Sequence, residues 1–536
     1  MDLRSQVQAW IDDDPDPLTA AQLQLWLDTD NEVELRTSFS GFLTFGTAGL
    51  RGPVRPGPSG MNRAVVGRTA CAIATYMRER KLNSVVIGRD ARHGSEEFTQ
   101  ETAQIMSGAG MKVYVLPRPL PTPVLAFATN ELKCDVGIMI TASHNPPQDN
   151  GYKVYLGGTV DGILYRGSQI ISPTDEAIAT HIDSITTLSN VPRGTHWSIV
   201  GEDIIEKYIE VTAAIATKPG TLKIVYSAMH GVGTQTLQQV FAAAGFAAPI
   251  LVAAQAQPDP DFPTVAFPNP EEPGAIDLAL ETARACDADL VIANDPDADR
   301  CAAAVKDPVT GWRMLRGDEL GAIFGESIAR NTSKGILANS IVSSTILSKI
   351  AQHYNLEFEQ TLTGFKWLAK IEGLTFGYEE ALGYAVDAGT VNDKDGISAA
   401  IKLVQIASDL AAEGRTLLDL LDEIWARHGF HASEQISIRF DDFSQIESIM
   451  DRLRKNPPTK IAGLSITSID DLSRPIDDLP PTNGLRIWLD GSIRVIIRPS
   501  GTEAKMKCYI EVIERDHARA EIVMNQLRIP IKELLS

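Results

Sequence analysis

Short apolar runs alternate with longer amphipathic segments along most of the chain. The runs 85–88, 136–140 and 336–342 are mainly apolar, which is typical of strands buried inside a parallel sheet. The segments 61–80 and 397–410 are apolar at near-helical spacing. This alternation predicts a mostly parallel α/β architecture, with helices between the strands.

The end of the chain has a different pattern. Residues 485–489 and 493–497 are strand-like, and Asp490-Gly491 between them is a good hairpin turn. A further strand at 507–512 and a closing helix at 518–535 follow. These elements predict a smaller α+β domain.

The length of 536 residues allows several hydrophobic cores. We expect three or four domains at this length, and we divide the chain at 1–200, 201–312, 313–432 and 433–536. The uncharged stretch 231–258 contains several Gln, Gly and Pro residues. We therefore expect a helix and a strand within a domain there, and no membrane span.

Composition narrows the function. The net charge of −20 argues against nucleic acid as a partner, because that needs a basic face. A phosphate ester would be repelled by the overall field, so local Arg, Lys and backbone N–H groups would have to bind it. The five scattered cysteines include no Cys-x-x-Cys pair, and the acidic N-terminus lacks an apolar signal core. We expect free thiols and a cytoplasmic protein.

One strand leads directly into a loop with reactive side chains. The run 136–140 is followed by the sequence TASHNPPQDNGYK. Asn145-Pro146-Pro147 cannot continue a strand, so Ser143 and His144 should lie in a loop at its carboxyl end, where α/β sheets bind ligands. Lys153, past a second turn, could fold back toward the hydroxyl. For Ser-His-Asn-Pro alone, a simple capped turn is the better interpretation.

A second strand, 288–293, ends in the sequence NDPDADR. Carboxylates at alternate positions, Asp295, Asp297 and Asp299, favour a hard divalent cation. An EF-hand would need Gly and Glu where Arg300 and Lys306 stand, so that class is excluded. A solvated acidic turn is the remaining alternative.

Three further loops carry polar groups suited to a ligand. The glycines of 46–52 surround Arg51, which could point into a ligand site. Glu379 and Glu380 could accept hydrogen bonds from sugar hydroxyls. The loop 498–505 offers guanidinium, hydroxyl, ammonium and backbone N–H donors suited to a phosphate. Each could also be a plain turn, and we read Arg89-Asp90 and the segment 393–396 as mainly structural.

Taken together and in this order, the loops resemble those of the α-D-phosphohexomutases, the family of phosphoglucomutases and phosphomannomutases. The matching sequences are GTAGLRG, TASHNPPQDNGYK, NDPDADR, GYEEALGY and RPSGTEAK. The resemblance implies three similar mixed-sheet α/β domains and a smaller C-terminal α+β domain around a central active-site cleft.

The resemblance also implies roles for individual residues. Ser143 would carry a phosphoryl group and Lys153 would transfer a proton, with His144 and Arg51 beside them. One Mg²⁺ would be held by Asp295, Asp297, Asp299 and an oxygen on Ser143. Substrate would be bound by Arg300, Lys366, Glu379, Glu380, Arg498, Ser500, Gly501, Thr502 and Lys505. The family's sugar loop contains a serine where Ala381 or Leu382 stands here, so it stays open which glutamate matches.

The implied reaction is reversible transfer of phosphate between the 1- and 6-positions of a hexose. Glucose 1-phosphate is the favoured substrate, with a phosphoserine, a sugar 1,6-bisphosphate intermediate and glucose 1,6-bisphosphate as activator. The sugar loop looks closest to the phosphoglucomutase and phosphopentomutase-type branch. Mannose or pentose specificity, a sugar bisphosphate synthase, a Mg²⁺-dependent sugar phosphatase and a sugar-phosphate-binding regulator are the alternatives. The sequence predicts no oligomeric state.

Overall fold

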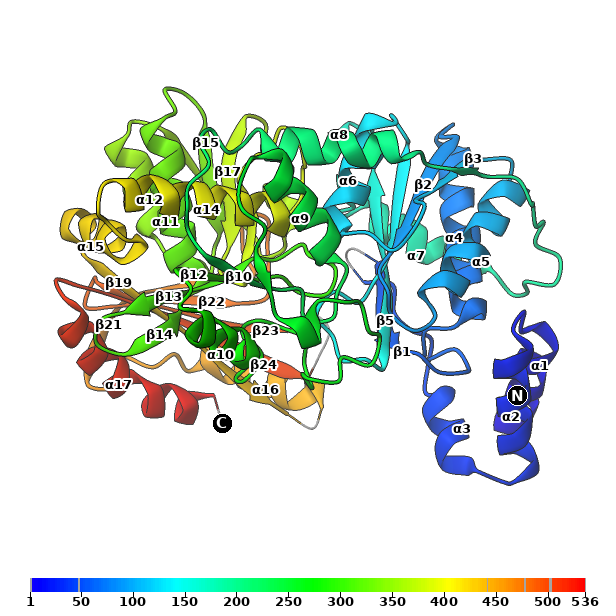
Figure 1. Ribbon diagram of the computed structural model, residues 1–536. Coiled ribbons are helices and arrows are strands. Elements are labelled where there is room, and N and C mark those ends of the chain that lie inside the picture. Colours follow the sequence, from blue (N-terminus) through cyan, green and yellow to red (C-terminus); the bar gives the residue numbers. More distant parts are fainter. Residues whose placement is uncertain (1, 47–48, 441, 477–478, 501–503, 536) are drawn as a thin grey trace. The chain divides into compact units, whose positions relative to one another are not determined.

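The computed structural model describes all residues except 1, 47–48, 441, 477–478, 501–503 and 536. The chain divides into two compact units. Unit 1 comprises Met1–Leu315, Ala369–Glu372 and Ala381–Ala412, and unit 2 comprises Arg316–Leu368, Gly373–Glu380 and Glu413–Ser536. Figure 1 labels their elements along the chain.

Unit 1 begins with three helices that precede its first sheet. They are α1 (Leu3–Asp13), α2 (Pro17–Asp28) and α3 (Glu32–Ser38). Each starts at an Asp or Asn whose side chain accepts a hydrogen bond from a backbone N–H of the first turn. The first sheet follows these helices along the chain.

The first sheet of unit 1 has the strand order β1-β5-β4-β2-β3-β9, and β8 pairs with β5. Strands β2, β3, β4 and β9 run parallel, while β5 lies antiparallel to β4 and β1. The strands are β1 (Gly49–Pro53), β2 (Ser84–Arg89), β3 (Lys112–Val115), β4 (Val136–Ile140), β5 (Asp149–Leu156), β8 (Ser168–Gln169) and β9 (Ser198–Ile199), with a separate hairpin of β6 (Thr159–Val160) and β7 (Ile163–Leu164). The helices are α4 (Arg63–Glu79), α5 (Ser95–Gly108), α6 (Thr122–Glu131) and α7 (Thr174–Ser184). Residues 136–140 form the buried strand that the apolar run predicts.

The second sheet of unit 1 has the order β11-β10-β12-β13-β14. Its strands are β10 (Ile224–Ser227), β11 (Ile250–Leu251), β12 (Leu290–Ala293), β13 (Ala302–Asp307) and β14 (Gly311–Met314). The helices α8 (Glu202–Ala213), α9 (Gly233–Ala243) and α10 (Asp277–Cys286) and the 3₁₀ turn η1 (Ala253–Gln255) accompany it. The uncharged stretch 231–258 forms α9, β11 and η1, as the sequence indicates. Among the described residues, no helix combines the length and apolar character needed to cross a membrane.

The segment 381–412 belongs to unit 1. It holds β18 (Gly383–Ala385) and α14 (Gly396–Ala412). The buried Tyr208 hydroxyl on α8 donates to the Asp395 carboxylate at 3.0 Å, and Asp395 also accepts the backbone N–H groups of Ile397 and Ser398. The capping predicted for residues 393–396 is therefore present. The bond from Tyr208 also fixes the loop before α14 to helix α8 of the same unit.

Unit 2 contains a parallel three-stranded core with the order β16-β15-β17. These strands are β15 (Ile336–Ser340), β16 (Glu357–Thr361) and β17 (Leu374–Glu379), with helices α11 (Gly317–Arg330), α12 (Ile346–His353), α13 (Phe365–Leu368) and α15 (Leu417–His428). Helix α12 begins at Ile346, and Ser343 lies in the turn after β15. The hydroxyl of Ser343 binds the backbone N–H of Glu380 there.

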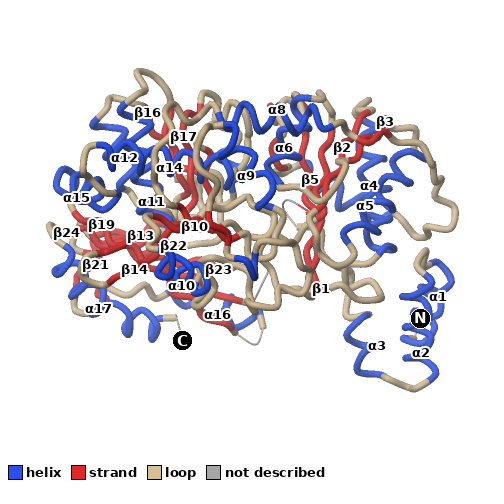
Figure 2. Tube along the Cα trace, in the orientation of Figure 1, coloured by secondary structure: helices blue, strands red, loops and turns tan. Residues whose placement is uncertain are grey.

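The C-terminal part of unit 2 is an antiparallel sheet with the order β19-β24-β23-β22-β21-β20. Its strands are β19 (Phe430–Arg439), β20 (Lys460–Ile461), β21 (Leu464–Asp471), β22 (Leu485–Leu489), β23 (Ile493–Pro499) and β24 (Lys505–Glu514). The helices α16 (Phe443–Lys455) and α17 (His517–Leu534) share a buried apolar cluster with it. Figure 2 draws strands in red and labels β19, β21, β22, β23 and β24 of this sheet. The predicted hairpin at 485–497 is confirmed by the β22–β23 pairing.

Candidate functional site

Ser143 lies in the loop that follows β4, close to the second sheet of unit 1. Its hydroxyl donates to Asp295 Oδ2 at 2.9 Å and lies 3.1 Å from His144 Nδ1. Ser143 adopts a φ of +54°, a conformation that costs free energy for a residue with a side chain. Its backbone N–H donates to the Thr141 hydroxyl at 2.9 Å. The loop therefore presents one hydroxyl to the carboxylates at the end of β12.

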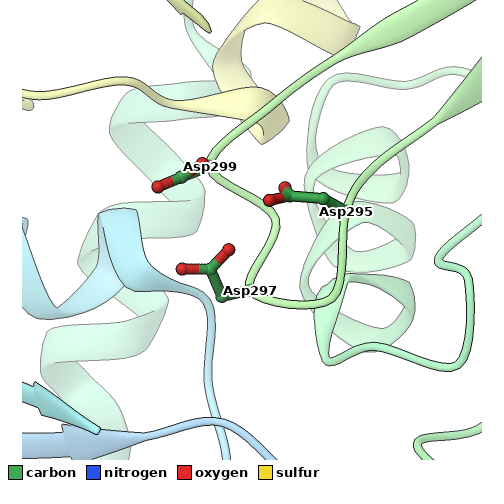
Figure 3. A group of neighbouring side chains, drawn as sticks. All are labelled: Asp295, Asp297 and Asp299. Carbon is green, nitrogen blue, oxygen red and sulfur yellow. The ribbon is translucent and has the colours of Figure 1, made fainter. Parts of the chain in front are cut away.

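The carboxylates of Asp295, Asp297 and Asp299 converge within the loop that connects β12 to β13. One oxygen of each lies within 4.8 Å of the others, and all three residues are at most 1% exposed. Figure 3 shows the three side chains turned toward a common space. Ala298, between two of them, has a φ of +53°, and this turn lets alternate side chains face the same way.

The charges of this acidic cluster are partly balanced. Burial, together with the negative charges of Asp297 and Asp299, raises the pKa of Asp295 well above its usual range. Burial also opposes ionisation of Asp297, but its pKa is lowered because Lys153 pairs with it. Lys153 Nζ lies 2.7 Å from Asp297 Oδ2 and 2.9 Å from Asp299 Oδ2. Burial likewise opposes ionisation of Asp299, but Lys153 and Lys394 lower its pKa, so two carboxylates are held ionised in a buried space.

The cluster fits a hard divalent cation. Oδ1 of Asp297 and Oδ1 of Asp299 are buried and have no hydrogen-bond partner among the described residues. Buried carboxylate oxygens left in this way are costly unless a cation or a donor reaches them. Three converging carboxylate oxygens are the ligand type that Mg²⁺ and Ca²⁺ prefer. The residues present can therefore hold one metal ion.

Antiparallel pairing brings Arg51 and Lys153 to the same loop. Strand β5 returns beside β4 and places Lys153 opposite Met139, and β1 pairs with β5 so that Arg51 faces Gly151. The Arg51 guanidinium donates to Asn145 Oδ1 at 3.2 Å.

Burial, with the positive charges of Arg300 and Arg51, lowers the pKa of His144 well below its usual value. The imidazole beside Ser143 is therefore neutral.

Arg300 follows the acidic cluster directly. Its backbone N–H donates to Asp295 Oδ1 at 3.0 Å, which fixes the turn, and its guanidinium pairs with Glu271 at 3.5 Å. It also forms an isolated β-bridge with Gly383. The arginine predicted to meet a sugar phosphate thus lies at the carboxylate cluster and has an anionic partner.

Two residues near the cluster are missed by sequence reasoning. The Thr122 hydroxyl, at the start of α6, donates to Asp297 Oδ2 at 2.6 Å. Lys394 Nζ lies 3.4 Å from Asp299 Oδ2. The segment 393–396 is expected to cap a helix, but one lysine within it also reaches the acidic loop. Thr122 carries no sequence signal, because a proline-rich segment that enters a helix occurs in many folds.

Within unit 2, the two glutamates have different partners. Glu379 Oε1 accepts the backbone N–H of Gly364 at 2.6 Å. Glu380 Oε2 accepts the hydroxyls of Ser340 at 3.0 Å and Ser343 at 2.9 Å. Burial, with Glu379 and Asp318 nearby, raises the pKa of Glu380 to about 7. Glu379 thus holds a neighbouring turn, whereas Glu380 is held by two serines that the sequence analysis does not single out.

The predicted phosphate-binding residues of unit 2 lie on two segments. Lys366 is a buried residue of the short helix α13. Arg498, near the end of β23, donates to the hydroxyl of Thr363, two residues before that helix. The backbone N–H of Ser500 donates to the carbonyl of Lys505 at 2.7 Å. Gly501 and Thr502 lie outside the described residues.

Comparison with known proteins places the chain in a family. Residues 43–189, 203–311 and 316–428 match the models of domains I, II and III of the phosphoglucomutase/phosphomannomutase family, each described as alpha/beta/alpha. The chain belongs to this phosphohexomutase family. Three α/β/α domains and a C-terminal sheet domain thus make up its fold. The chain is a phosphomutase-type isomerase.

Relatives within the phosphohexomutase family carry different names. A protein from Haemophilus influenzae named as a probable phosphomannomutase is 44% identical over 482 residues, which cover 89% of this chain and 98% of that protein. A phosphopentomutase from Mus musculus is 35% identical over 95% of this chain and 90% of its own length. The crystal structure of a phosphoglucomutase/phosphomannomutase family protein from Burkholderia thailandensis has a TM-score of 0.70 at 20% identity, covering 91% of this chain and 97% of that one. This last likeness concerns the fold alone.

Proposed function

We propose that the chain is a phosphosugar mutase that moves a phosphoryl group reversibly between the 1- and 6-positions of a hexose, with glucose 1-phosphate as substrate. The observation that carries the proposal is the 2.9 Å hydrogen bond between Ser143 Oγ and the buried Asp295 carboxylate. It sets a hydroxyl nucleophile beside a site suited to a divalent cation. Family membership supplies the reaction class.

Ser143 is the proposed phosphoryl carrier. In the transfer step, the phosphorus–oxygen bond to Ser143 breaks while a bond to a sugar hydroxyl oxygen forms. The sugar hydroxyl loses a proton, and Ser143 Oγ is left to accept one. Lys153 is assigned to this proton transfer, and neutral His144, 3.1 Å from Ser143 Oγ, is the neighbour that can pass a proton to or from that oxygen.

The acidic cluster is proposed to hold one Mg²⁺ through Asp295, Asp297, Asp299 and an oxygen on Ser143. The ion would supply charge neutralisation at the transferring phosphoryl group. Lys153, Arg51 and Arg300 add positive charge around the same loop. Local cations are needed, because the net charge of −20 repels anionic substrates.

Residues of unit 2 are proposed to bind the sugar and its second phosphate. Glu380 would accept hydrogen bonds from sugar hydroxyls, with Glu379 supporting the neighbouring turn. The phosphate would be bound by Lys366, Arg498, Ser500, Gly501, Thr502 and Lys505. A sugar 1,6-bisphosphate would form, turn around and return its other phosphate to Ser143, so glucose 1,6-bisphosphate would activate the enzyme.

A parallel assay tests the proposal. Purified protein is incubated with Mg²⁺, a trace of glucose 1,6-bisphosphate, and glucose, mannose or ribose 1-phosphate, and the isomer product and free phosphate are followed together. Glucose 6-phosphate without free phosphate, and no product from the Ser143→Ala variant, is the expected result. Faster turnover of mannose or ribose 1-phosphate would reassign the sugar. Free phosphate alone would indicate a phosphatase.

A further inference from the structure

Arg92 holds the loop that carries Ser143. Its buried guanidinium donates four hydrogen bonds to backbone carbonyl groups of that loop. One terminal nitrogen binds the carbonyls of Ser143 and Asn145, both at 2.7 Å. The other binds those of Pro146 at 2.8 Å and Asp149 at 3.1 Å. One side chain thus satisfies acceptors on both sides of the Pro-Pro turn.

The guanidinium is itself fixed. Asp90 lies 3.2 Å from Arg92 Nε, and both side chains are 1% exposed. Asp90 also accepts the backbone N–H of Arg92 at 3.0 Å and the hydroxyl of Ser95 at 2.8 Å. The ring of Phe262 lies 4.9 Å from the guanidinium carbon. The orientation of Arg92 is therefore set by the loop after β2, by α5 and by a loop of the second sheet domain.

The serine loop needs such support. Pro146 and Pro147 provide no backbone N–H group, so the loop cannot close a regular ladder of its own. Ser143 holds its positive φ only if the surrounding structure enforces it. The direct bond from Arg92 to the Ser143 carbonyl fixes the peptide plane that follows the Ser143 Cα, the atom from which the side chain projects.

We propose that Arg92 is a positioning residue that keeps the Ser143 hydroxyl in line with the carboxylate cluster. The role rests on the proposed function, since it concerns phosphoryl transfer through Ser143. Arg92 acts through the loop backbone, because its guanidinium binds main-chain carbonyls of that loop and is anchored by Asp90. A lysine could not replace it, because one ammonium cannot reach four acceptors in the plane of a guanidinium.

Arg68 offers a matched control. It is also a buried arginine of unit 1, lies 4.9 Å from the ring of Trp10, and binds Asp13 and the carbonyl of Ile185. These partners lie outside the serine loop. Arg92→Lys and Arg68→Lys therefore remove comparable packing and charge geometry at different places.

The test measures kcat, KM for glucose 1-phosphate and thermal stability. It also measures the rate at which glucose 1,6-bisphosphate phosphorylates Ser143, followed as a mass increase of about 80 Da, the mass of one phosphoryl group. Arg92→Lys should lower kcat and the phosphorylation rate together by about 100-fold, with KM nearly unchanged, because a displacement of about 1 Å can cost that much. Arg68→Lys should lose stability but keep kcat. Asp90→Asn, which loosens Arg92 without removing it, should change kcat in the same direction by a smaller factor.

Equal kcat values for wild type and folded Arg92→Lys would overturn the proposal. A fall in kcat no larger than that of Arg68→Lys at a similar loss of stability would also overturn it. If Arg92→Lys does not fold, the proposal is overturned by a normal kcat in Asp90→Asn. Failure of the wild-type protein to acquire phosphate on Ser143 would instead refute the proposed function.

Discussion

Lys153 and Asp297 form a buried ion pair at 2.7 Å, although 144 positions separate them in the chain. The pair joins the two sheet domains of unit 1 at the acidic cluster. Lys153 remains protonated there, because Asp297 and Asp299 outweigh the effect of burial and raise its pKa. The ammonium of Lys153 thus contacts two of the three carboxylates in the acidic cluster.

Two variants of Lys153 can distinguish the role of its positive charge from its role in proton transfer. Lys153→Arg keeps a positive charge but cannot exchange a proton near neutral pH, so we expect kcat to fall by about 10²- to 10⁴-fold. Lys153→Met should lose similar activity and also stability, since Asp297 and Asp299 would lack their partner. Steady-state kinetics and thermal unfolding measure both effects. Wild-type kcat in Lys153→Arg would show that only the charge matters.

Asp297→Asn should weaken binding of Mg²⁺. The change removes a ligand charge from the cluster and leaves the amide beside Lys153. We expect the Mg²⁺ concentration for half-maximal activity to rise at least about 10-fold. Mutating a residue that only hydrogen-bonds to a metal ligand already lowers metal affinity by about that factor. Asp289→Asn, at an exposed position before β12, is the matched control. The same Mg²⁺ dependence in both variants would exclude the cluster as the metal site.

Ser343→Ala should move the pH dependence of substrate binding. Burial raises the pKa of Glu380 from 4.5 to about 7, and the Ser343 hydroxyl limits this rise because it stabilises the carboxylate. Without the hydroxyl, the pKa should be higher. The pH below which KM increases should therefore shift upward relative to wild type. The control is Ser348→Ala, which changes a serine of α12 that has no contact with Glu380 among the described residues. The substrate phosphate titrates in the same way with both variants, so a difference between their pH profiles reports on Glu380.

The carboxyl group of Glu380 also makes the free energy of unfolding depend on pH. Because the folded-state pKa of Glu380 lies above the unfolded value, the folded state binds the proton more tightly. Its contribution to the free energy of unfolding is present below pH 4.5 and is lost as the pH rises to about 7. Glu380→Gln should flatten this part of the stability profile. An unchanged profile, measured by urea unfolding from about pH 4.5 to about pH 7.5, would contradict the pKa.

The sequence predicts the strands and the positions of the reactive loops well. The run 136–140 is a strand with the limits expected, since a uniformly apolar run bounded by turn residues has few alternatives. The convergence of Asp295, Asp297 and Asp299 also follows from the sequence, because a turn at the end of β12 places alternate side chains on one side. The roles of these residues are implied by the family resemblance and stay a prediction.

Contacts between distant segments cannot be predicted in the same way. The bonds from Arg92 to the serine loop and from Thr122 to Asp297 join residues with no shared periodicity. They depend on how strands pair and helices pack, which spacing alone does not determine. The same holds for Ser343, whose hydroxyl meets the backbone of Glu380 across 37 positions of the chain.

Arg498 and Thr363 provide the last prediction. Arg498 donates to the Thr363 hydroxyl, so its guanidinium is held beside the helix that carries Lys366. A charge-assisted hydrogen bond to a phosphate contributes about 1.5–3 kcal/mol, so Arg498→Ala should raise KM for the sugar phosphate by about 10- to 100-fold. Thr363→Val keeps the guanidinium but removes the hydroxyl that accepts its hydrogen bond, so it should raise KM less than Arg498→Ala does.

The kcat value distinguishes binding from chemistry in this series. Arg498 is proposed to bind the non-reacting phosphate, so kcat should change little in both variants. Arg486→Lys, on the neighbouring strand β22, alters an ion pair with Asp470 and serves as control. If Arg498→Ala leaves KM at the value of that control, Arg498 does not bind the phosphate. If kcat falls and KM is unchanged, its role belongs to the transfer step, because only interactions made in the transition state lower kcat in this way.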